Sequence, residues 1–135
     1  MIDLKDSRIL VIGGAGFLGS HVIDELLKEP VKEIIIYDNF VRGKLKNIEI
    51  ALLDSRVKIF GLGGDIRDVD VLNEAMKNMD YVFHLAALWL RYCHDFPRSG
   101  LMTNVIGTFN VLEACADHKI KKLIFSSSAS VYGDA

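Results

Sequence analysis

The apolar run Arg8-Ile-Leu-Val-Ile12 leads directly into the glycine-rich stretch Gly13-Gly-Ala-Gly16-Phe-Leu-Gly19. Glycines in such a turn permit a sharp bend, a close approach of a diphosphate to the backbone and tight packing of helix on strand. Residues 16–29 then show a helical pattern, and the N-terminus of a helix attracts phosphate. A strand, a glycine loop and a helix in this order predict a dinucleotide-binding turn, with a tight turn that holds no ligand as the alternative.

Four further apolar runs come later in the chain, and most are continuous rather than alternating, which is typical of parallel strands buried on both faces. The runs are Glu33-Ile-Ile-Ile-Tyr37, Val57-Lys-Ile-Phe60, Tyr81-Val-Phe-His84 and Lys122-Leu-Ile-Phe125. Helical patterns lie between them over residues 16–29, 68–78 and 98–118, with a weaker one over 42–54. We therefore expect one α/β domain, residues 1–135, with a doubly wound parallel sheet of about five strands and helices on both faces. A complete fold of this type has about six strands, so this one is expected to be incomplete.

Composition excludes several classes of protein. The chain has 135 residues, of which 50% are hydrophobic and 25% charged, so it is not a disordered chain. Its formal net charge of −2 disfavours nucleic-acid binding. Cys93 and Cys115 do not make a disulfide framework, and charges at Lys5, Asp6 and Arg8 interrupt any signal-like apolar run. These features predict a cytoplasmic protein that does not enter membranes.

Two acidic residues lie just after predicted strands, at the edge where ligands bind in open α/β sheets. Asp38 lies 19 residues beyond Gly19, close to the spacing expected of a carboxylate that binds the adenosine ribose. Such a carboxylate would repel a 2′-phosphate, so Asp38 favours NAD over NADP; the alternative is a turn-capping role shared with Asn39. Asp65 could bond the adenine amino group, or cap the next helix.

Two other strand ends carry polar side chains. We interpret His84 as a buried structural histidine, and His84, Cys93 and His94 lack the spacing of zinc ligands, so no metal site is predicted. The hydroxyl-rich stretch after Phe125 falls where substrates sit in such sheets, although by itself it is more simply a polar strand end in water.

Six short motifs occur in the chain in the order and at the spacing that are typical of one known superfamily. The chain resembles the extended short-chain dehydrogenase/reductase superfamily, and within it the NAD-dependent nucleotide-sugar epimerases and dehydratases, with the UDP-glucose 4-epimerases as the most similar group. The resemblance covers essentially all of the chain. The motifs are Gly13-Gly-Ala-Gly-Phe-Leu-Gly19, Tyr37-Asp-Asn39, Gly64-Asp-Ile66, His84-Leu-Ala-Ala87, Asn104-Val-Ile-Gly-Thr108 and Ser126-Ser-Ser-Ala-Ser-Val-Tyr-Gly133.

The resemblance implies a Rossmann-like fold and a site for NAD. Backbone groups of the glycine loop would contact the pyrophosphate. The residues after the second strand would hold the adenosine ribose, with the following loop to Gly43 lining that side, and those after the third would contact the adenine. The residues after the fourth strand would run beneath the pyrophosphate and the nicotinamide ribose. A residue of the long helix would add a further contact, whereas Asn104 is interpreted as mainly structural. The expected cofactor-binding residues are Gly13, Gly16, Phe17, Leu18, Gly19, Asp38, Asn39, Gly43, Asp65, Ile66, Leu85, Ala86, Ala87 and Thr103.

The catalytic set implied by the resemblance is present only in part. Ser128 matches the catalytic Ser/Thr, which would orient the reacting sugar hydroxyl of a nucleotide sugar, above all a UDP-sugar. The family's Tyr-x-x-x-Lys is missing, because Tyr37, Tyr81 and Tyr92 have no lysine four residues later and Tyr132 would need residue 136. Trp89 stands where the family often has a polar residue near the ribose. The chain is therefore expected to be the N-terminal part of a longer enzyme, without a substrate domain and inactive by itself.

Three functional interpretations of the sequence stay open. The first is the NAD-binding part of a nucleotide-sugar epimerase. The second is a dehydratase or reductase of the same superfamily, and the third is a non-catalytic dinucleotide-binding module, which the missing Tyr-x-x-x-Lys favours. Family members commonly pair through the helix expected over residues 98–118, whose apolar positions exceed one narrow stripe, so a homodimer is expected. The alternative is that the whole stripe packs inside one domain.

Overall fold

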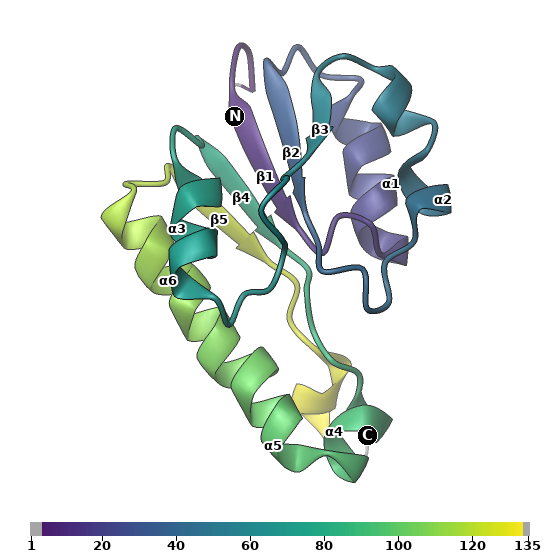
Figure 1. The fold of residues 1–135 in the computed structure, drawn as a ribbon, viewed down its shortest axis with the longest axis vertical. Helices are drawn as coiled ribbons and strands as arrows, with labels where there is room; N and C mark the ends of the chain where they lie inside the picture. Colours follow the sequence, from purple (N-terminus) through teal and green to yellow (C-terminus); the bar gives the residue numbers. More distant parts are fainter. Residues whose placement is uncertain (1–3, 134–135) are drawn as a thin grey trace.

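The computed structural model describes residues 4–133, and these form a single parallel sheet. Its five strands run in the order β3-β2-β1-β4-β5, with β1 at the centre (Figure 1). The strands are β1 (Arg8–Ile12), β2 (Glu33–Tyr37), β3 (Val57–Ile59), β4 (Tyr81–His84) and β5 (Lys122–Phe125). The predicted doubly wound sheet is confirmed, and each strand begins at the predicted residue.

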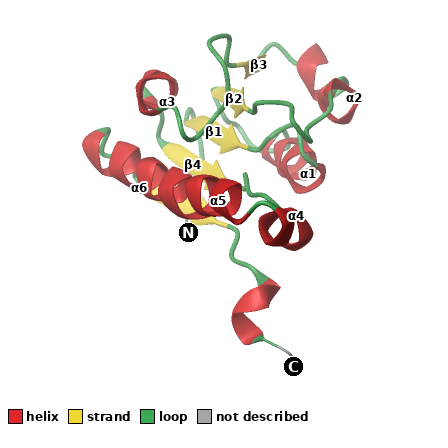
Figure 2. Cartoon of the chain, turned by 60° about the horizontal axis from the view of Figure 1, so that its bottom comes forward, coloured by secondary structure: helices red, strands yellow, loops and turns green. Residues whose placement is uncertain are grey.

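Helices cover both faces of the sheet (Figures 1 and 2). One face carries α1 (Phe17–Leu26), the short α2 (Leu45–Ile48) and the 3-10 turn η1 (Ala51–Leu53). The other carries α3 (Val69–Met76) and α6 (Thr108–Asp117), which contact each other. The helix predicted over residues 42–54 is thus reduced to α2 and η1, while those predicted over 16–29 and 68–78 are a few residues shorter.

Alternate residues of the central strands supply the two halves of the core. Ile9 and Val11 of β1 lie with Ile23 of α1 in the first half. Leu10 of β1 lies with Leu72 of α3 in the second. All five side chains are fully buried, and burial of one such side chain contributes about 1.5–3 kcal/mol to folding. The continuous apolar pattern of β1 therefore reflects helices packed on both faces.

The helix expected over residues 98–118 consists of three consecutive segments. These are α5 (Pro97–Gly100), a π-helical segment η2 (Leu101–Gly107) and α6. The π-helical turns were not predicted from the apolar pattern, nor was the helix α4 (Leu90–Asp95) that precedes them. No residue of α4 is buried. The spacing of Trp89, Tyr92 and Phe96 was the available helical signal for this short element.

Most of the apolar stripe on η2 and α6 faces solvent. Val111 and Ala114 enter the core, and Gly107 lies against Ile66. The remaining apolar side chains are between 39% and 55% exposed. These residues, which we call the open face, are Leu101, Met102, Val105, Ile106, Phe109 and Leu112. The alternative that the whole stripe packs inside the domain is therefore wrong for the chain as it stands.

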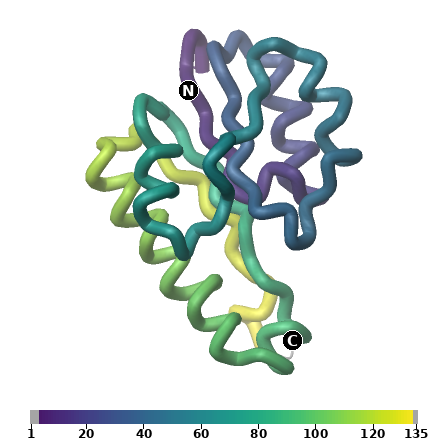
Figure 3. Tube along the Cα trace, in the orientation of Figure 1, coloured from purple at the N-terminus to yellow at the C-terminus, as the bar shows by residue number. Residues whose placement is uncertain are grey.

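The loops after β1, β2 and β4 gather at one end of the sheet (Figure 3). The segment beyond β5 is exposed, and its 3-10 turn η3 (Ala129–Tyr132) stands away from the helices in Figure 2. β5 pairs with β4, and its own residues are exposed or half-buried, unlike the buried residues of β1. Between residues 4 and 133, no helix is both long and apolar enough to cross a membrane.

Candidate functional site: a cleft at the carboxyl ends of the strands

The glycine loop packs too closely for side chains at two of its positions. Gly13 has a φ of +82°, and a Cβ there would lie 2.8 Å from the backbone nitrogen of Ala86. A Cβ on Gly19 would overlap the carbonyl oxygen of Gly13. The loop is therefore pressed between α1 and the segment after β4; the close approach of α1 is what the glycine pattern predicts, and the contact with Ala86 is decided by the fold. Within the described chain no side chain caps the N-terminus of α1, so its first N–H groups and the positive end of its dipole face the cleft.

Asp38 joins the end of β2 to the glycine loop. Its Oδ2 accepts a hydrogen bond from the N–H of Ala15 at 2.9 Å, and its Oδ1 accepts one from the N–H of Phe40 at 2.8 Å. Asn47 donates to the carbonyl of Ala15 at 2.8 Å. Asp38 thus has the turn-capping role that the sequence offered as an alternative, and its remaining lone pairs are those that could accept from a ribose. The role of Asn47 was missed, because the helical pattern around it is weak.

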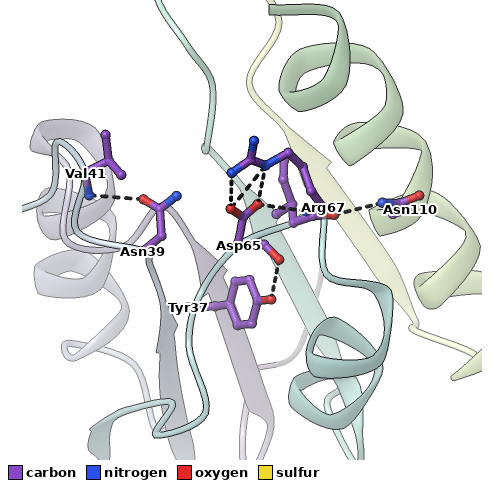
Figure 4. Close-up of polar contacts among 7 residues, drawn as sticks. Tyr37, Asn39, Val41, Asp65, Arg67 and Asn110 are labelled. Atoms are coloured by element: carbon purple, nitrogen blue, oxygen red, sulfur yellow. Dashed lines mark hydrogen bonds and ion pairs between the residues drawn. The ribbon is translucent and has the colours of Figure 1, made fainter. Parts of the chain in front are cut away.

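The third strand end builds the adenine side of the expected site (Figure 4). Arg67 donates to the carboxylate of Asp65 from its Nε and Nη2 atoms, and this pairing holds the pKa of Asp65 below its usual range. Tyr37 donates its hydroxyl to the carbonyl of Asp65 at 2.8 Å, and burial raises the pKa of Tyr37. The expectation that Asp65 caps the next helix is wrong, since Asp68 accepts the hydrogen bond from the N–H of Val71 at the start of α3.

Asn104 of η2 holds the wall formed by residues 85–88. Its Oδ1 accepts from the N–H of Leu88 at 2.8 Å, and its Nδ2 donates to the carbonyl of Leu88 at 2.9 Å. This two-point contact resembles the pairing of a neighbouring strand, and it ties the helix to the loop after β4. The interpretation of Asn104 as mainly structural agrees with this geometry. The part of the fold that Asn104 supports is the wall of the cleft.

His84 is fully buried below the same wall. Its Nε2 lies 3.0 Å from the hydroxyl of Thr108, while its Nδ1 has no partner among the described residues. Desolvation lowers its pKa to about 4, which keeps the ring neutral. The prediction of a buried structural histidine is confirmed. Within residues 4–133, no three His, Cys, Asp or Glu side chains come together as metal ligands.

These elements enclose a cleft of about 510 Å³. Every expected cofactor-binding residue, from the glycine loop to Thr103, lines it. Ser128 is not among the lining residues; its hydroxyl accepts a hydrogen bond from the N–H of Ser130 at 3.2 Å on the exposed segment beyond β5. Val41 and Arg42 line the cleft as part of the loop expected beside the ribose. The lining residues that the sequence patterns did not assign to the cofactor are Lys44, Asn47, Gly64, Arg67, Leu88, Tyr92 and Ser99. Most of these lie in loops after strands, and that position was the available signal.

The strand order and the cleft define the Rossmann class of nucleotide-binding folds, in which ligands bind outside the carboxyl ends of the strands. A family model described as "NAD dependent epimerase/dehydratase family" matches residues 9–135. The chain belongs to this family.

Curated relatives and solved structures agree with this membership. The UDP-glucose 4-epimerase of Rickettsia bellii is 35% identical over 133 residues, which cover 94% of this chain and 38% of that protein. The chain therefore spans well under half the length of this relative.

Two solved structures illustrate the similarity in three dimensions. A UDP-N-acetylglucosamine 4-epimerase from Methanobrevibacter ruminantium has a TM-score of 0.86 and 37% identity, and the match covers 97% of this chain and 41% of that one. A UDP-glucose 4-epimerase from Bifidobacterium longum, in complex with NAD+ and UDP, has a TM-score of 0.80 and 34% identity, with 94% and 38% covered.

Proposed function

We propose that residues 1–135 are the NAD-binding part of a nucleotide-sugar epimerase of the UDP-glucose 4-epimerase kind, whose substrate domain is not in this sequence. The observation that carries the proposal is the cleft. Residues chosen from four separate sequence motifs, together with Gly43 and Thr103, all line one cavity at the carboxyl ends of the strands. The similar epimerase from Bifidobacterium longum, which holds NAD+ and UDP, supports both the cofactor and the class of substrate.

The lining residues suit each part of NAD. Backbone N–H groups of Phe17 and Leu18, at the uncapped start of α1, would hold the diphosphate. Asp38 would accept hydrogen bonds from the adenosine ribose, with Asn39 and Gly43 beside it. Asp65 and Ile66 would contact the adenine. Leu85, Ala86, Ala87 and Thr103 would line the nicotinamide ribose.

Asp38 also supports a preference for NAD over NADP. Two backbone N–H groups already donate to its carboxylate and hold it at the ribose side of the cleft. A second negative group, the 2′-phosphate of NADP, would lie beside this charge and be repelled. We therefore expect NAD to bind more tightly.

Bound NAD would supply the redox chemistry by taking up a hydride from the sugar and returning it. Ser128 is the catalytic residue that we propose in this chain. It would hydrogen-bond the reacting sugar hydroxyl and orient its proton toward a general base. That base would be the tyrosine of a Tyr-x-x-x-Lys, which residues 1–135 do not contain.

Calorimetric titration of the chain with NAD and NADP tests the proposed function. We expect saturable NAD binding and an affinity for NADP at least tenfold weaker. Incubation with NAD and a panel of UDP-sugars should give no epimerisation, because the general base is missing. Tighter binding of NADP would contradict the cofactor assignment, and turnover by the chain alone would contradict the assignment of the catalytic groups.

A dehydratase is the second candidate, because the family description names dehydratases beside epimerases. The two activities share the first hydride transfer and differ in the later steps of the reaction. A longer protein that carries this sequence would separate them: an epimerase returns a sugar of unchanged mass, whereas a dehydratase releases water, which mass spectrometry of the product detects.

The partner and location that we propose rest on an exposed surface and on the state of the cysteines. The open face of η2 and α6, with Phe109 55% exposed, is the surface through which two copies would pair as a homodimer. Cys93 and Cys115 are both free thiols, which is typical of the reducing cytoplasm. We therefore infer a cytoplasmic homodimer.

A further inference from the structure

Arg42 and Trp89 meet across the cleft. The guanidinium carbon of Arg42 lies 4.1 Å from the centre of the Trp89 ring. Arg42 belongs to the loop between β2 and α2, and Trp89 immediately precedes α4 in the segment after β4. Because β2 and β4 flank β1 on opposite sides, this contact joins the two sides of the cleft on either side of the glycine loop.

The backbone around Arg42 is held beside Asp38. A Cβ on the following residue, Gly43, would lie 2.7 Å and 2.8 Å from the two carboxylate oxygens of Asp38. The turn before Arg42 is fixed by two side-chain contacts: Asp38 accepts from the N–H of Phe40, and Asn39 accepts from the N–H of Val41 at 3.1 Å. The loop therefore presents the Arg42 side chain to the cleft from a defined anchor.

Trp89 also contacts a second aromatic ring. Its ring centre lies 5.1 Å from that of Tyr92, and the ring of Tyr92 lies 4.8 Å from that of Phe96. These three rings lie along α4, so the contacts with Tyr92 and Phe96 restrict the orientations that the indole can take. The guanidinium lies over an indole, the strongest of the aromatic cation partners, and among the described residues it donates no hydrogen bond. The N–H donors at its edge stay available.

Among the residues that the structure describes, Arg42 is a cation without an acidic partner. Arg67 is bonded to Asp65 and Arg56 to Asp54, but none of the ion pairs within residues 4–133 involves Arg42, which nevertheless lines the cleft. A planar guanidinium with free edge donors matches two oxygens of a phosphate. The cleft thus contains an unpaired guanidinium whose backbone is anchored on the β2 side of the glycine loop and whose head reaches Trp89, next to the wall of residues 85–88.

We propose that Arg42, oriented by Trp89, binds the diphosphate of the dinucleotide, so that this side chain and the N-terminus of α1 hold it together. The assignment rests on the proposed function. Trp89 acts here as a positioning residue. This role accounts for an aromatic side chain at a position where the family often has a polar one. The diphosphate is the ligand group recognised, and the adenosine is recognised elsewhere in the cleft.

Titration of Arg42→Gln with NAD, ADP and adenosine tests the contact with the diphosphate. Losing a charged hydrogen-bonding partner should weaken NAD and ADP about tenfold to hundredfold and leave adenosine within about twofold. Arg42→Lys should fall between the two proteins, because a lysine carries the charge without the fork. Arg91→Gln is the matched control, since Arg91 is exposed and is not among the residues that line the cleft, and it should bind all three ligands as the unchanged chain does.

A double-mutant cycle tests the positioning by Trp89. Trp89→Leu should weaken ADP about threefold to tenfold when Arg42 is present and have no effect in the Arg42→Gln background, because the two changes remove one interaction. Trp89→Phe should restore most of the affinity. Trp89 is the single tryptophan of the chain, so its fluorescence should change on addition of ADP and the change should diminish in Arg42→Gln.

The outcomes separate this assignment from the proposed function. If the unchanged chain binds NAD and Arg42→Gln binds ADP equally well, the diphosphate contact is wrong while the NAD site stands. Equal losses for adenosine and ADP would also overturn the contact. If the unchanged chain binds neither NAD nor ADP, both proposals fail. The side chains of Arg42 and Trp89 are both exposed, so neither substitution should unfold the chain. Thermal unfolding of each variant verifies this.

Discussion

The carboxylate of Asp38 accepts a hydrogen bond from the backbone N–H of Ala15 at 2.9 Å. The residue expected to recognise the ribose therefore also fixes the loop expected to hold the diphosphate. Asn47 and the N–H of Lys44 bond the carbonyl of the same alanine, at 2.8 Å and 3.0 Å. The two parts of the site are thus built as one unit, and a change at Asp38 should affect both.

Replacing Asp38 with asparagine should reduce both affinity and stability. The amide keeps one acceptor oxygen but turns an NH2 group toward one of the two backbone donors, leaving that donor unsatisfied. We expect NAD to bind about tenfold to hundredfold more weakly, and the free energy of unfolding to fall by about 1–3 kcal/mol. Calorimetry and urea denaturation measure the two effects, with the exposed Asp117→Asn as the control. An Asp38→Asn protein of unchanged stability would show that Asp38 does not brace the loop.

Replacing Asn104 with alanine should loosen the wall of residues 85–88. The variant leaves the N–H and carbonyl of Leu88 without their side-chain partner, which should cost about 1–3 kcal/mol of unfolding free energy and weaken NAD severalfold. Hydrogen exchange should show faster exchange at the N–H of Leu88. Asn73→Ala is the control, because Asn73 donates to the carbonyl of Val69 on α3 and is not among the cleft-lining residues. Equal effects of the two variants on NAD binding would contradict the role of Asn104.

The burial of His84 predicts a loss of stability in mild acid. Its pKa is about 4 in the folded chain against 6.5 in the unfolded chain, so below pH 6.5 the unfolded state binds the proton more readily. Its contribution to the unfolding free energy should be constant above pH 6.5 and fall by up to about 3 kcal/mol as the pH drops to 4. Ion pairs lower the pKa of Asp65 and Asp80, whose effects therefore come at more acidic pH.

Denaturation curves from pH 7.5 to pH 4.5 measure this slope. The slope should flatten in His84→Asn, which does not titrate, and stay unchanged in His94→Gln, which alters an exposed ring. A steep slope that persists in His84→Asn would assign the acid sensitivity to other groups.

A charge on the open face should prevent self-association. Sedimentation velocity at micromolar concentrations should show a dimer, which Phe109→Glu converts to a monomer without unfolding the chain, because burying a carboxylate in an apolar interface is costly. Leu53→Glu is the control, since Leu53 is 85% exposed on η1, at the opposite face of the sheet. A monomer at every concentration of the unchanged chain would remove the proposal of a homodimer.

Local patterns predict much of this fold because they act over short distances along the chain. The strand ends at Ile12 and Tyr37 are predictable from apolar runs that are buried on both faces. The π-helical η2 was not predictable in this way, because apolar spacing does not distinguish it from an α-helix. The helix α4 was missed for a different reason: it has only six residues, and the helical spacing of Trp89, Tyr92 and Phe96 around it was overlooked.

The sequence by itself determined the strands, the glycine loop and the acidic strand ends of this protein, since period and glycine placement are properties of neighbouring residues. Only the tertiary structure decided that Arg42 stacks on Trp89, that Asn104 clamps Leu88 and that Phe109 faces solvent. These relationships depend on the strand order β3-β2-β1-β4-β5, which brings together loops that are distant in the chain. Which side chains meet there is set by the packing of whole elements, because a local pattern fixes the direction of a strand but not the strand that lies beside it.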